Sequence, residues 1–357
     1  FMLCLSFGML IFRSGKLKSK VQMESLLSKE AIFLYNNLFF LTAFVIVFVG
    51  TLYPLFIEVM KFQKVSVGAP YYNAVFMPVA WGLILLMGVG PYIPWRKASV
   101  SAIKDILTVP FAVGFCALPF LYLVGVQDLY ALSALSVTFF TGTAIVRDYM
   151  QLTNMWAERY QLSKPRAFLK AIRQNPRKTA GILTHVGVLV MTIGVVCSTI
   201  FQAEKIQAMK PGESVMLNDY RFKLVKIYPV IGSNWSGHES LFEVYDKNNK
   251  LAANLRPQKR LYEVSQTPTT EAAIHQIYTG HLFVTIPEVS PDASWVRVRA
   301  LHNPLVLWVW YGGAIMGIGV LMNIFRGVIF SMGRKKVAAT APIVPSTEGD
   351  PPLGAVS

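Results

Sequence analysis

The feature that most constrains this chain is a set of six long stretches that contain no Lys, Arg, Asp or Glu. A membrane-spanning helix needs roughly 20 apolar residues to cross a ~30 Å hydrocarbon core. All but the fourth stretch exceed that length, and the fourth is at the short end of the usable range. The stretches are Ala31 to Ile57, Val65 to Trp95, Ile106 to Gln127, Leu129 to Val146, Thr179 to Ala203 and Ala300 to Phe325. The sequence therefore predicts a polytopic α-helical membrane protein with about six complete spans.

The composition agrees with this fold class and argues against two others. Hydrophobic residues make up 54% of the chain and charged residues only 15%, whereas soluble domains carry roughly 25% charged residues and disordered chains have low hydrophobicity. A seventh apolar run, Phe1 to Phe12, is too short to span and lacks the charged start and cleavage site of a signal peptide. We interpret it as the end of a truncated helix, and we expect the chain to be a fragment or one product of a split gene.

Basic residues are concentrated in alternate connectors, and this pattern predicts the topology. Cytoplasmic connectors carry an excess of Lys and Arg, and segments 13–30, 94–105, 147–178 and 326–357 are rich in them. Region 202–302 instead contains twelve basic and ten acidic residues. Most of the net charge of +15 therefore lies in the segments predicted to be cytoplasmic. We expect this inner face to attract anionic membrane lipid, and we expect no nucleic-acid partner.

These boundaries define an expected order of segments. It is 1–12 truncated transmembrane helix, 13–30 cytoplasmic loop, 31–57 transmembrane helix, 58–72 periplasmic loop, 73–93 transmembrane helix, 94–105 cytoplasmic loop, 106–127 and 129–146 transmembrane hairpin, 147–178 cytoplasmic amphipathic connector, 179–201 transmembrane helix, 202–302 periplasmic domain, 303–325 transmembrane helix and 326–357 cytoplasmic tail. The connector is expected to lie among the lipid headgroups as two pieces split at Ser163-Lys-Pro165. The Pro- and Ala-rich end of the tail is expected to be disordered.

Region 202–302 has the patterns of a small β-rich domain. Apolar and polar residues alternate from Leu241 to Asp246, residues 247–250 resemble a turn, and Leu251 onward is expected to pair back. Arg221 to Tyr228 and His281 to Ile286 are further predicted strands. Thr270 to Tyr278 is predicted to form a short helix that begins at a Thr cap. The prediction is an antiparallel barrel or sandwich inserted between two spans.

Few residues in the chain are suited to catalysis or metal binding. Cys4, Cys116 and Cys197 lie in apolar runs, make no CxxC pair and are interpreted as small buried hydrophobes. The sequence has no P-loop, no GxGxxG after a strand and no HExxH, so an ATP-driven transporter subunit is not favoured. Four of the five histidines lie in or beside the β-rich region, and their spacing indicates no metal site; they are His238, His275, His281 and His302.

The fifth histidine, His185, differs because it lies inside an uncharged run, seven residues after Lys178. An imidazole about 10 Å beyond that charge is costly in a membrane without a partner, and such residues are often functional. Neutral imidazole is also a common axial ligand of haem iron. Gly181, Gly187 and Gly194 would allow a flat cofactor to approach. The residues alone leave a packing role open, in which His185 hydrogen-bonds a neighbouring helix.

Several segments, in order along nearly the whole chain, resemble the CcmF family of cytochrome c haem lyases, also called CycK or NrfE. They are Leu27 to Asn37, Gly50 to Pro54, Val65 to Asn73, Gly88 to Pro91, Asn175 to Val195, Thr270 to Ile274 and Asn303 to Gly313. The resemblance covers only the C-terminal half of that family. The missing half would carry the tryptophan-rich segment that holds the substrate haem, two external histidines and the first membrane histidine.

The resemblance implies a function and partners. His185 occupies the position of the family's second membrane histidine, which implies that it is an axial ligand of a b-type haem in the inner membrane of a bacterium. Gly181 and Gly187 are expected to pack near that haem. The family attaches haem, delivered by the chaperone CcmE, to the CxxCH motif of apocytochrome c on the outer face. The implied partners are CcmE, apocytochrome c, CcmH- and CcmI-type maturation subunits and the missing N-terminal half.

Two other functions are compatible with the same residues. The first is a membrane scaffold whose outer domain docks maturation partners and in which His185 has a packing role only. The second is a transporter component, for haem or another small molecule, which would need broken helices and polar residues at mid-membrane. Asn36, Asn37, Thr184 and His185 are too few, and too close to the inner end, to favour the transporter.

Overall fold

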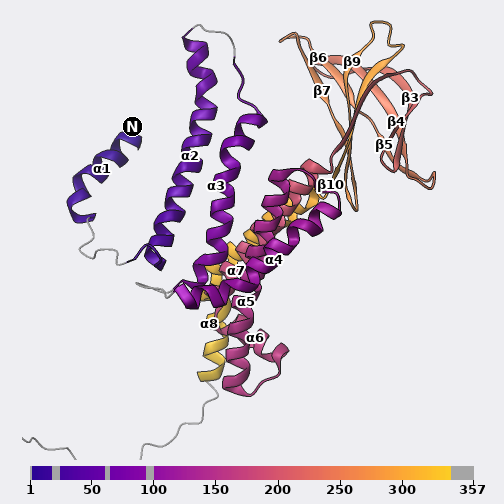
Figure 1. The fold of residues 1–357 in the computed structure, drawn as a ribbon. Coiled ribbons are helices and arrows are strands. Elements are labelled where there is room, and N and C mark those ends of the chain that lie inside the picture. Colours follow the sequence, from indigo (N-terminus) through magenta and orange to yellow (C-terminus); the bar gives the residue numbers. More distant parts are fainter. Residues whose placement is uncertain (1, 18–24, 61–64, 94–99, 339–357) are drawn as a thin grey trace, which may run out of the picture.

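The computed structural model describes residues 2–17, 25–60, 65–93 and 100–338 as helices, strands and their connections (Figure 1). Parts of the expected loops 13–30, 58–72 and 94–105, and the end of the expected disordered tail, lie outside the described residues. The helices are α1 (Met2–Leu17), α2 (Lys29–Val59), α3 (Ala69–Val89), α4 (Val100–Leu123), α5 (Leu129–Tyr160), α6 (Lys164–Gln174), α7 (Pro176–Ile200) and α8 (Leu307–Ala338), with a 3₁₀ turn, η1 (Gly90–Tyr92).

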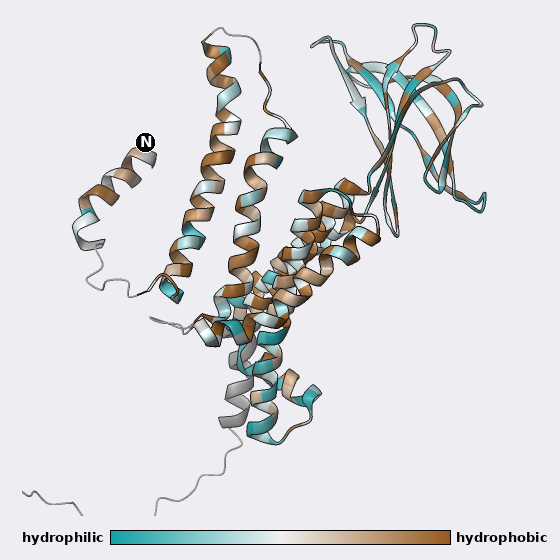
Figure 2. Cartoon of the chain, viewed as in Figure 1, coloured by the Kyte–Doolittle hydropathy of each residue, from teal (hydrophilic) through white to brown (hydrophobic). Residues whose placement is uncertain are grey.

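Six of the described helices are long and apolar enough to cross a membrane, which confirms the predicted fold class. They are Lys29–Val59, Ala69–Tyr92, Ile106–Leu123, Leu129–Tyr160, Pro176–Ile200 and Leu307–Phe325. A shorter apolar helix covers Cys4–Gly15. Apolar residues lie along the length of these helices, whereas polar residues gather around α6 (Figure 2). Many large apolar side chains of α2 and α8 remain exposed, as is expected of surfaces that contact lipid or other transmembrane helices.

The helix α5 is longer than the expected span 129–146 because it continues without a break to Tyr160. No Gly or Pro interrupts residues 143–160, so the helical hydrogen bonds continue beyond the uncharged run. The helix ends where Gln161 adopts a left-handed conformation, with φ of 49°, and α6 follows after Ser163. At its other end α5 is capped by Asp128, whose carboxylate accepts a hydrogen bond from the Ala131 N–H at 2.8 Å.

The β-rich region forms two antiparallel sheets. Its strands are β1 (Ala203–Met209), β2 (Ser214–Leu217), β3 (Tyr220–Ile231), β4 (Trp235–Tyr245), β5 (Leu251–Leu255), β6 (Gln258–Tyr262), β7 (Thr267–Glu271), β8 (Ala273–Ile277), β9 (Gly280–Val289) and β10 (Val296–Pro304). One sheet has the order β1-β10-β9-β8 and the other the order β2-β3-β4-β6-β7, with β5 paired to β4. The predicted strands at 221–228, 241–246, 251 onward and 281–286 are confirmed.

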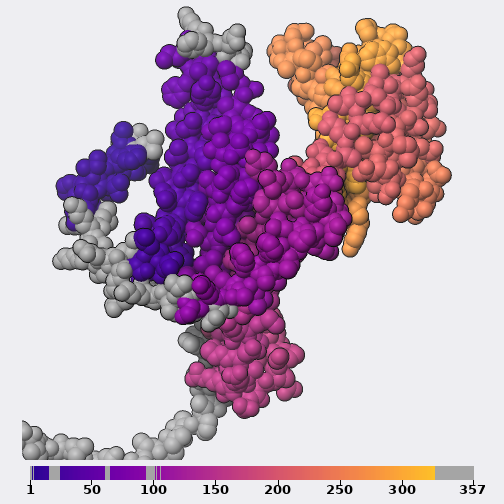
Figure 3. All heavy atoms as spheres, in the orientation of Figure 1, coloured from indigo at the N-terminus to yellow at the C-terminus, as the bar shows by residue number. Residues whose placement is uncertain are grey.

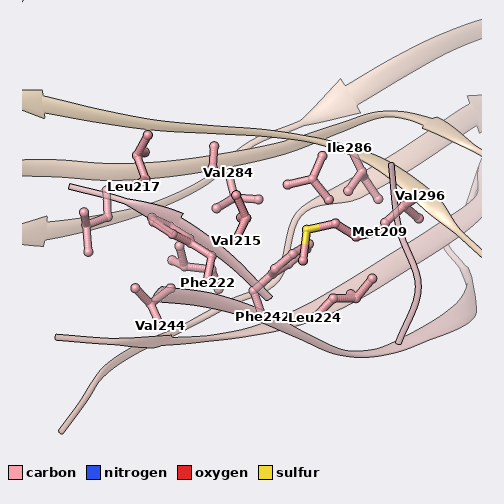
Figure 4. Close-up of a cluster of buried hydrophobic side chains, with 14 of the residues drawn as sticks. Met209, Val215, Leu217, Phe222, Leu224, Phe242, Val244, Val284, Ile286 and Val296 are labelled. Atoms are coloured by element: carbon pink, nitrogen blue, oxygen red, sulfur yellow. The ribbon is translucent and has the colours of Figure 1, made fainter. Parts of the chain in front are cut away.

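The core of this sandwich lies between the two sheets. Leu282, Val284 and Ile286 alternate along β9 with less buried residues and are fully buried. They face Phe222 and Phe242 of the second sheet in one continuous hydrophobic cluster (Figure 4). This two-residue period is the reason that the sequence predicted strands here correctly.

The short helix predicted for Thr270 to Tyr278 is wrong. This segment instead forms the end of β7 and all of β8, with Thr270 opposite Lys259 and Ile274 opposite Phe283. The chain passes from one sheet to the other between Glu271 and Ala273. Pairing with the neighbouring strands β6 and β9 therefore overrides the local preference of this segment for helix.

The sandwich joins the helices through one continuous antiparallel connection. The helix α7 ends at Ile200 and β1 begins at Ala203; β10 ends at Pro304 and α8 begins at Leu307. The strands β1 and β10 pair along their length, with Ala203 opposite His302, and α7 and α8 pack against each other. A helix pair thus continues directly into a strand pair, and the sandwich stands at one end of the helices (Figure 3).

Four glycines allow α7 and α8 to approach closely. A Cβ atom at Gly312 would lie 2.5 Å from the Met191 backbone N and 2.6 Å from the Gly187 carbonyl O. A Cβ at Gly194 would lie 2.6 Å from the Val309 N, and one at Gly319 would lie 2.8 Å from the Ala180 O. The glycines are spaced seven residues apart on each helix, so they repeat on one face, and small residues at such positions let membrane helices pack backbone to backbone.

We expect Gly312→Ala to destabilise the protein, because the added methyl group meets backbone atoms that cannot move without separating the helices. Overpacking of this kind costs about 1–3 kcal/mol. Gly317→Ala is the matched control, because its Cβ would meet no atom within 4 Å. Thermal unfolding of the two variants in detergent would compare them, and equal midpoints would contradict the close contact.

Candidate functional site

A cavity of about 600 Å³ lies between α2, α3, α7 and α8, and His185 is part of its wall. Its lining is Lys29, Ile32, Phe33, Asn36, Phe40, Leu83, Ile84, Leu86, Met87, Gly90, Pro91, His185, Val188 and Met316. Most of these side chains are apolar, and the cavity volume is within the ~300–1,000 Å³ range of small-molecule and cofactor sites. The cavity is therefore the candidate functional site.

His185 reaches the cavity from α7, about 14 Å along the helix from its first residue, Pro176. The side chain is half-buried, and among the residues that the structure describes none forms a hydrogen bond with its ring. The neighbouring Thr184 bonds to its own helix, with its hydroxyl donating to the Ala180 carbonyl at 3.1 Å. The imidazole is thus the polar group of this helix that faces the cavity without a protein partner, so the packing role is not supported by a hydrogen bond.

The opposite wall of the cavity is formed by one face of α2. Lys29, Ile32, Phe33, Asn36 and Phe40 follow the spacing i, i+3, i+4, i+7 and i+11 and line the same space. Sequence reasoning counted Asn36 only as a polar membrane residue and placed Lys29 in a loop. The helical spacing of Lys29 and Asn36, seven residues apart, is the signal that could have placed the two polar side chains on one face.

The two glycines expected beside His185 have different surroundings. Gly187 is buried against α8, where a Cβ would lie 2.7 Å from the Gly312 carbonyl O. Gly181 is exposed, and a Cβ there would meet no atom within 4 Å. Neither glycine lines the cavity, so the described residues give Gly187 a role in helix packing.

The first turn of α7 is tied to α5, and this fixes the helix that carries His185. The Lys178 ammonium donates to the Asp148 carboxylate at 2.8 Å, and Asp148 is buried. The Tyr149 and Thr179 hydroxyls are 3.2 Å apart. An ion pair whose acidic member is buried restrains geometry more than an exposed pair does, so the base of α7 is held in one position and rotation.

Comparison with known proteins agrees with this architecture. The family model described as "CcmF C-terminal beta-sandwich" matches residues 200–304. The chain is 30% identical over 325 residues to the cytochrome c-type biogenesis protein CcmF of Haemophilus influenzae, covering 90% of this chain and 48% of the relative. It is 32% identical over 316 residues to CcmF of Pseudomonas fluorescens, covering 88% and 46%. This chain matches the C-terminal half of the CcmF family.

A solved structure has the same fold. The structure named "Cytochrome c Heme Lyase CcmF" superposes with a TM-score of 0.67 at 24% identity, covering 89% of this chain and 49% of that one. The chain spans about half the length of the curated CcmF relatives that it matches. Both relatives are named as cytochrome c-type biogenesis proteins.

The remaining histidines are distributed over the CcmF-type sandwich, and the structure does not bring them together with His185. His238 lies on β4 and lines a cleft at the end of the sandwich farthest from the helices. His275 and His281 lie on the paired strands β8 and β9. The described residues contain no group of three or more His, Cys, Asp and Glu side chains that could hold a metal ion.

His302 is the exception because it is buried at the base of the sandwich. Its Nδ1 is 3.1 Å from the Asn218 amide nitrogen, and its ring packs edge-on against Tyr220. Its Nε2 is buried without a hydrogen-bond partner among the described residues. Burial lowers the pKa of His302, and the nearby Asp219 opposes this effect only in part. The neutral ring is therefore the form that the fold favours.

We expect the CcmF-type sandwich to lose stability as the pH falls below about 6.5, the ordinary histidine pKa. The folded pKa of His302 is lowered, so the unfolded chain takes up a proton at a higher pH than the folded chain does. The contribution of His302 to the free energy of unfolding is therefore fully present above pH 6.5. It declines as the pH falls toward the pKa that His302 has in the folded chain.

Limited proteolysis of the full chain across this pH range would measure the decline. His302→Gln should reduce the dependence on pH, because an amide does not titrate, whereas His275→Gln should retain it. An identical pH dependence for the unsubstituted chain and His302→Gln would contradict the assignment.

Proposed function

We propose that this chain is the haem-binding C-terminal part of a cytochrome c haem lyase, and that His185 is an axial ligand of a b-type haem in the cavity between α2, α3, α7 and α8. The observation that carries the proposal is the imidazole of His185, which faces an apolar cavity of about 600 Å³ without a protein partner. Neutral imidazole in such surroundings is a common ligand of haem iron.

The residues of the cavity fit a haem better than a bare metal ion. His185 is the one imidazole in the lining, so an iron bound there would need its other ligands from a macrocycle and from a second axial residue outside the described lining. The apolar side chains of α2 and α3 would pack against a flat ring. Lys29 and Asn36 carry the donor groups that suit carboxylates such as haem propionates.

This chain's own residues would set the properties of the bound group. When bound, the haem supplies one-electron redox chemistry. His185 would bind the iron from a fixed place, because the base of α7 is held by Lys178 and Asp148 and its far half by the glycine contacts with α8. The apolar wall would exclude water.

The partners follow from the same proposal. The chain would act with the remaining half of the lyase, which we expect to supply the second axial histidine and the tryptophan-rich segment. The haem would come from CcmE, the thiols from the CxxCH motif of apocytochrome c, and CcmH- or CcmI-type subunits would present the substrate. The relatives named for cytochrome c biogenesis support this assignment.

A second candidate is a docking scaffold without a haem of its own. The observation that favours it is a cleft of about 650 Å³ at the far end of the sandwich, lined by four prolines together with His238, Lys259 and Arg260. The two functions are distinguishable because only the first depends on His185.

We expect His185→Gly to remove the b-type absorption band of the lyase purified with its remaining half, and added imidazole to restore it by entering the space left by the side chain. The test is an absorption spectrum of the reduced protein with and without imidazole, together with the yield of mature cytochrome c. His275→Ala is the control and should retain the band. An unchanged band in His185→Gly would contradict the ligand assignment.

We also propose an orientation in the inner membrane of a bacterium, with the sandwich in the periplasm. The basic helix α6 lies at the end of the helices opposite the sandwich (Figure 1), as the distribution of Lys and Arg predicts. Reporter fusions at Lys250 should report the periplasm and fusions at Lys104 and Lys170 the cytoplasm. A reversed pattern would overturn the orientation but leave the haem assignment to be judged by its own spectrum.

A further inference from the structure

The hairpin between β8 and β9 is held against the beginning of α8. Leu305, which links β10 to α8, donates its backbone N–H to the Thr279 carbonyl at 2.9 Å. Gly280 pairs with Pro304, and a Cβ at Gly280 would lie 2.8 Å from the Pro304 Cα. The tip of the hairpin is therefore fixed, backbone to backbone, beside the first turn of a membrane-spanning helix.

Exposed aromatic side chains gather at this junction. Tyr278, at the tip of the hairpin, is fully exposed, while Trp310 is 70% and Tyr311 is 53% exposed. The apolar span of α8 begins at Leu307, so the aromatic residues of the helix lie within about 6 Å of its start. Trp and Tyr concentrate at this depth in membrane proteins because an apolar ring with a polar edge suits the boundary between water and hydrocarbon.

A notch of about 570 Å³ separates the hairpin from α8. Its lining includes Gln276, Tyr278, Thr279, Trp308 and Tyr311, and none of the described residues that line it is charged. Amide, hydroxyl and indole groups can form hydrogen bonds with a phosphate ester or a glycerol backbone without any net charge. The notch is thus suited to neutral or zwitterionic polar groups.

We infer that this aromatic notch docks on the headgroup layer of the bilayer and binds zwitterionic phospholipid. The occupant is lipid, since Ile318 and Phe325 lie seven and fourteen residues after Tyr311 on the same face of α8 and are exposed. Acyl chains would lie along this face. The contact fixes the base of the sandwich at the membrane surface. This lipid contact would use uncharged groups. At the opposite end of the helices, α6 instead carries several Lys and Arg residues.

The test places an environment-sensitive fluorophore at the hairpin tip. Tyr278→Cys would be labelled in the full chain after Cys4, Cys116 and Cys197 are replaced by Ala, and the protein would be inserted in nanodiscs of phosphatidylcholine. We expect a blue shift of the label and its quenching by brominated phosphatidylcholine. The matched control is Val264→Cys, an exposed position on the turn between β6 and β7, where neither effect should occur.

Three outcomes separate lipid from other occupants. Equal behaviour of the two labels in nanodiscs would overturn the proposal. A blue shift of the label at Tyr278→Cys that appears only after the remaining half of the lyase is added would also overturn the proposal. It would assign the notch to a protein partner. A blue shift that appears only when phosphatidylglycerol is added, and that is lost at high salt, would show binding of anionic lipid. This result would contradict the proposed recognition of zwitterionic lipid by uncharged groups. A label at Gln276→Cys, inside the notch, should reproduce the result of Tyr278→Cys.

Discussion

The close antiparallel contact between α7 and α8 is the interaction on which the rest of the structure depends. Gly187 and Gly194 on one helix and Gly312 and Gly319 on the other remove the side chains that would keep the backbones apart. The same two chain segments continue as the paired strands β1 and β10. Contacts between the same two chain segments thus run without a break from the membrane region into the sandwich.

This contact also decides which direction His185 faces. Residues two positions apart on a helix are about 200° apart around its axis, so the burial of Gly187 against α8 turns His185 away from that contact. The ion pair between Lys178 and Asp148 fixes the rotation at the base of α7. The imidazole is consequently directed toward the cavity shared with α2 and α3. The site is thus a product of helix packing rather than of a local motif.

The sandwich depends on the same geometry at its base. His302 lies on β10, next to the strand that leaves α7, and is buried where the sheets meet the helices. The hairpin tip at Tyr278 is held by Leu305 at the start of α8. Both features lie where the strand pair becomes a helix pair, so the orientation of the domain relative to the membrane is set within a few residues of this junction.

Local sequence patterns were sufficient where one physical force dominates. Uncharged runs identified the spans because unpaired charge is costly in hydrocarbon, and two-residue alternation identified β3, β4 and β9 because one face of each strand is buried. The segment Thr270 to Tyr278 was assigned wrongly because pairing with the neighbouring strands β6 and β9 decides its structure, and its own residues do not show that pairing. Lys29 and Asn36 were not placed in the site because they lie far from His185 along the chain and meet it only through helix packing.

The sequence by itself therefore determined the fold class and the β-rich character of region 202–302, and it singled out His185 as a candidate, because these follow from hydropathy, alternation and the cost of a polar group in a membrane. The tertiary structure alone decided which residues face His185, that Gly187 packs against α8 and that the tip of the β8–β9 hairpin lies beside α8. The physical reason is that these contacts join segments far apart in the chain, so packing between elements, and no local preference, sets them.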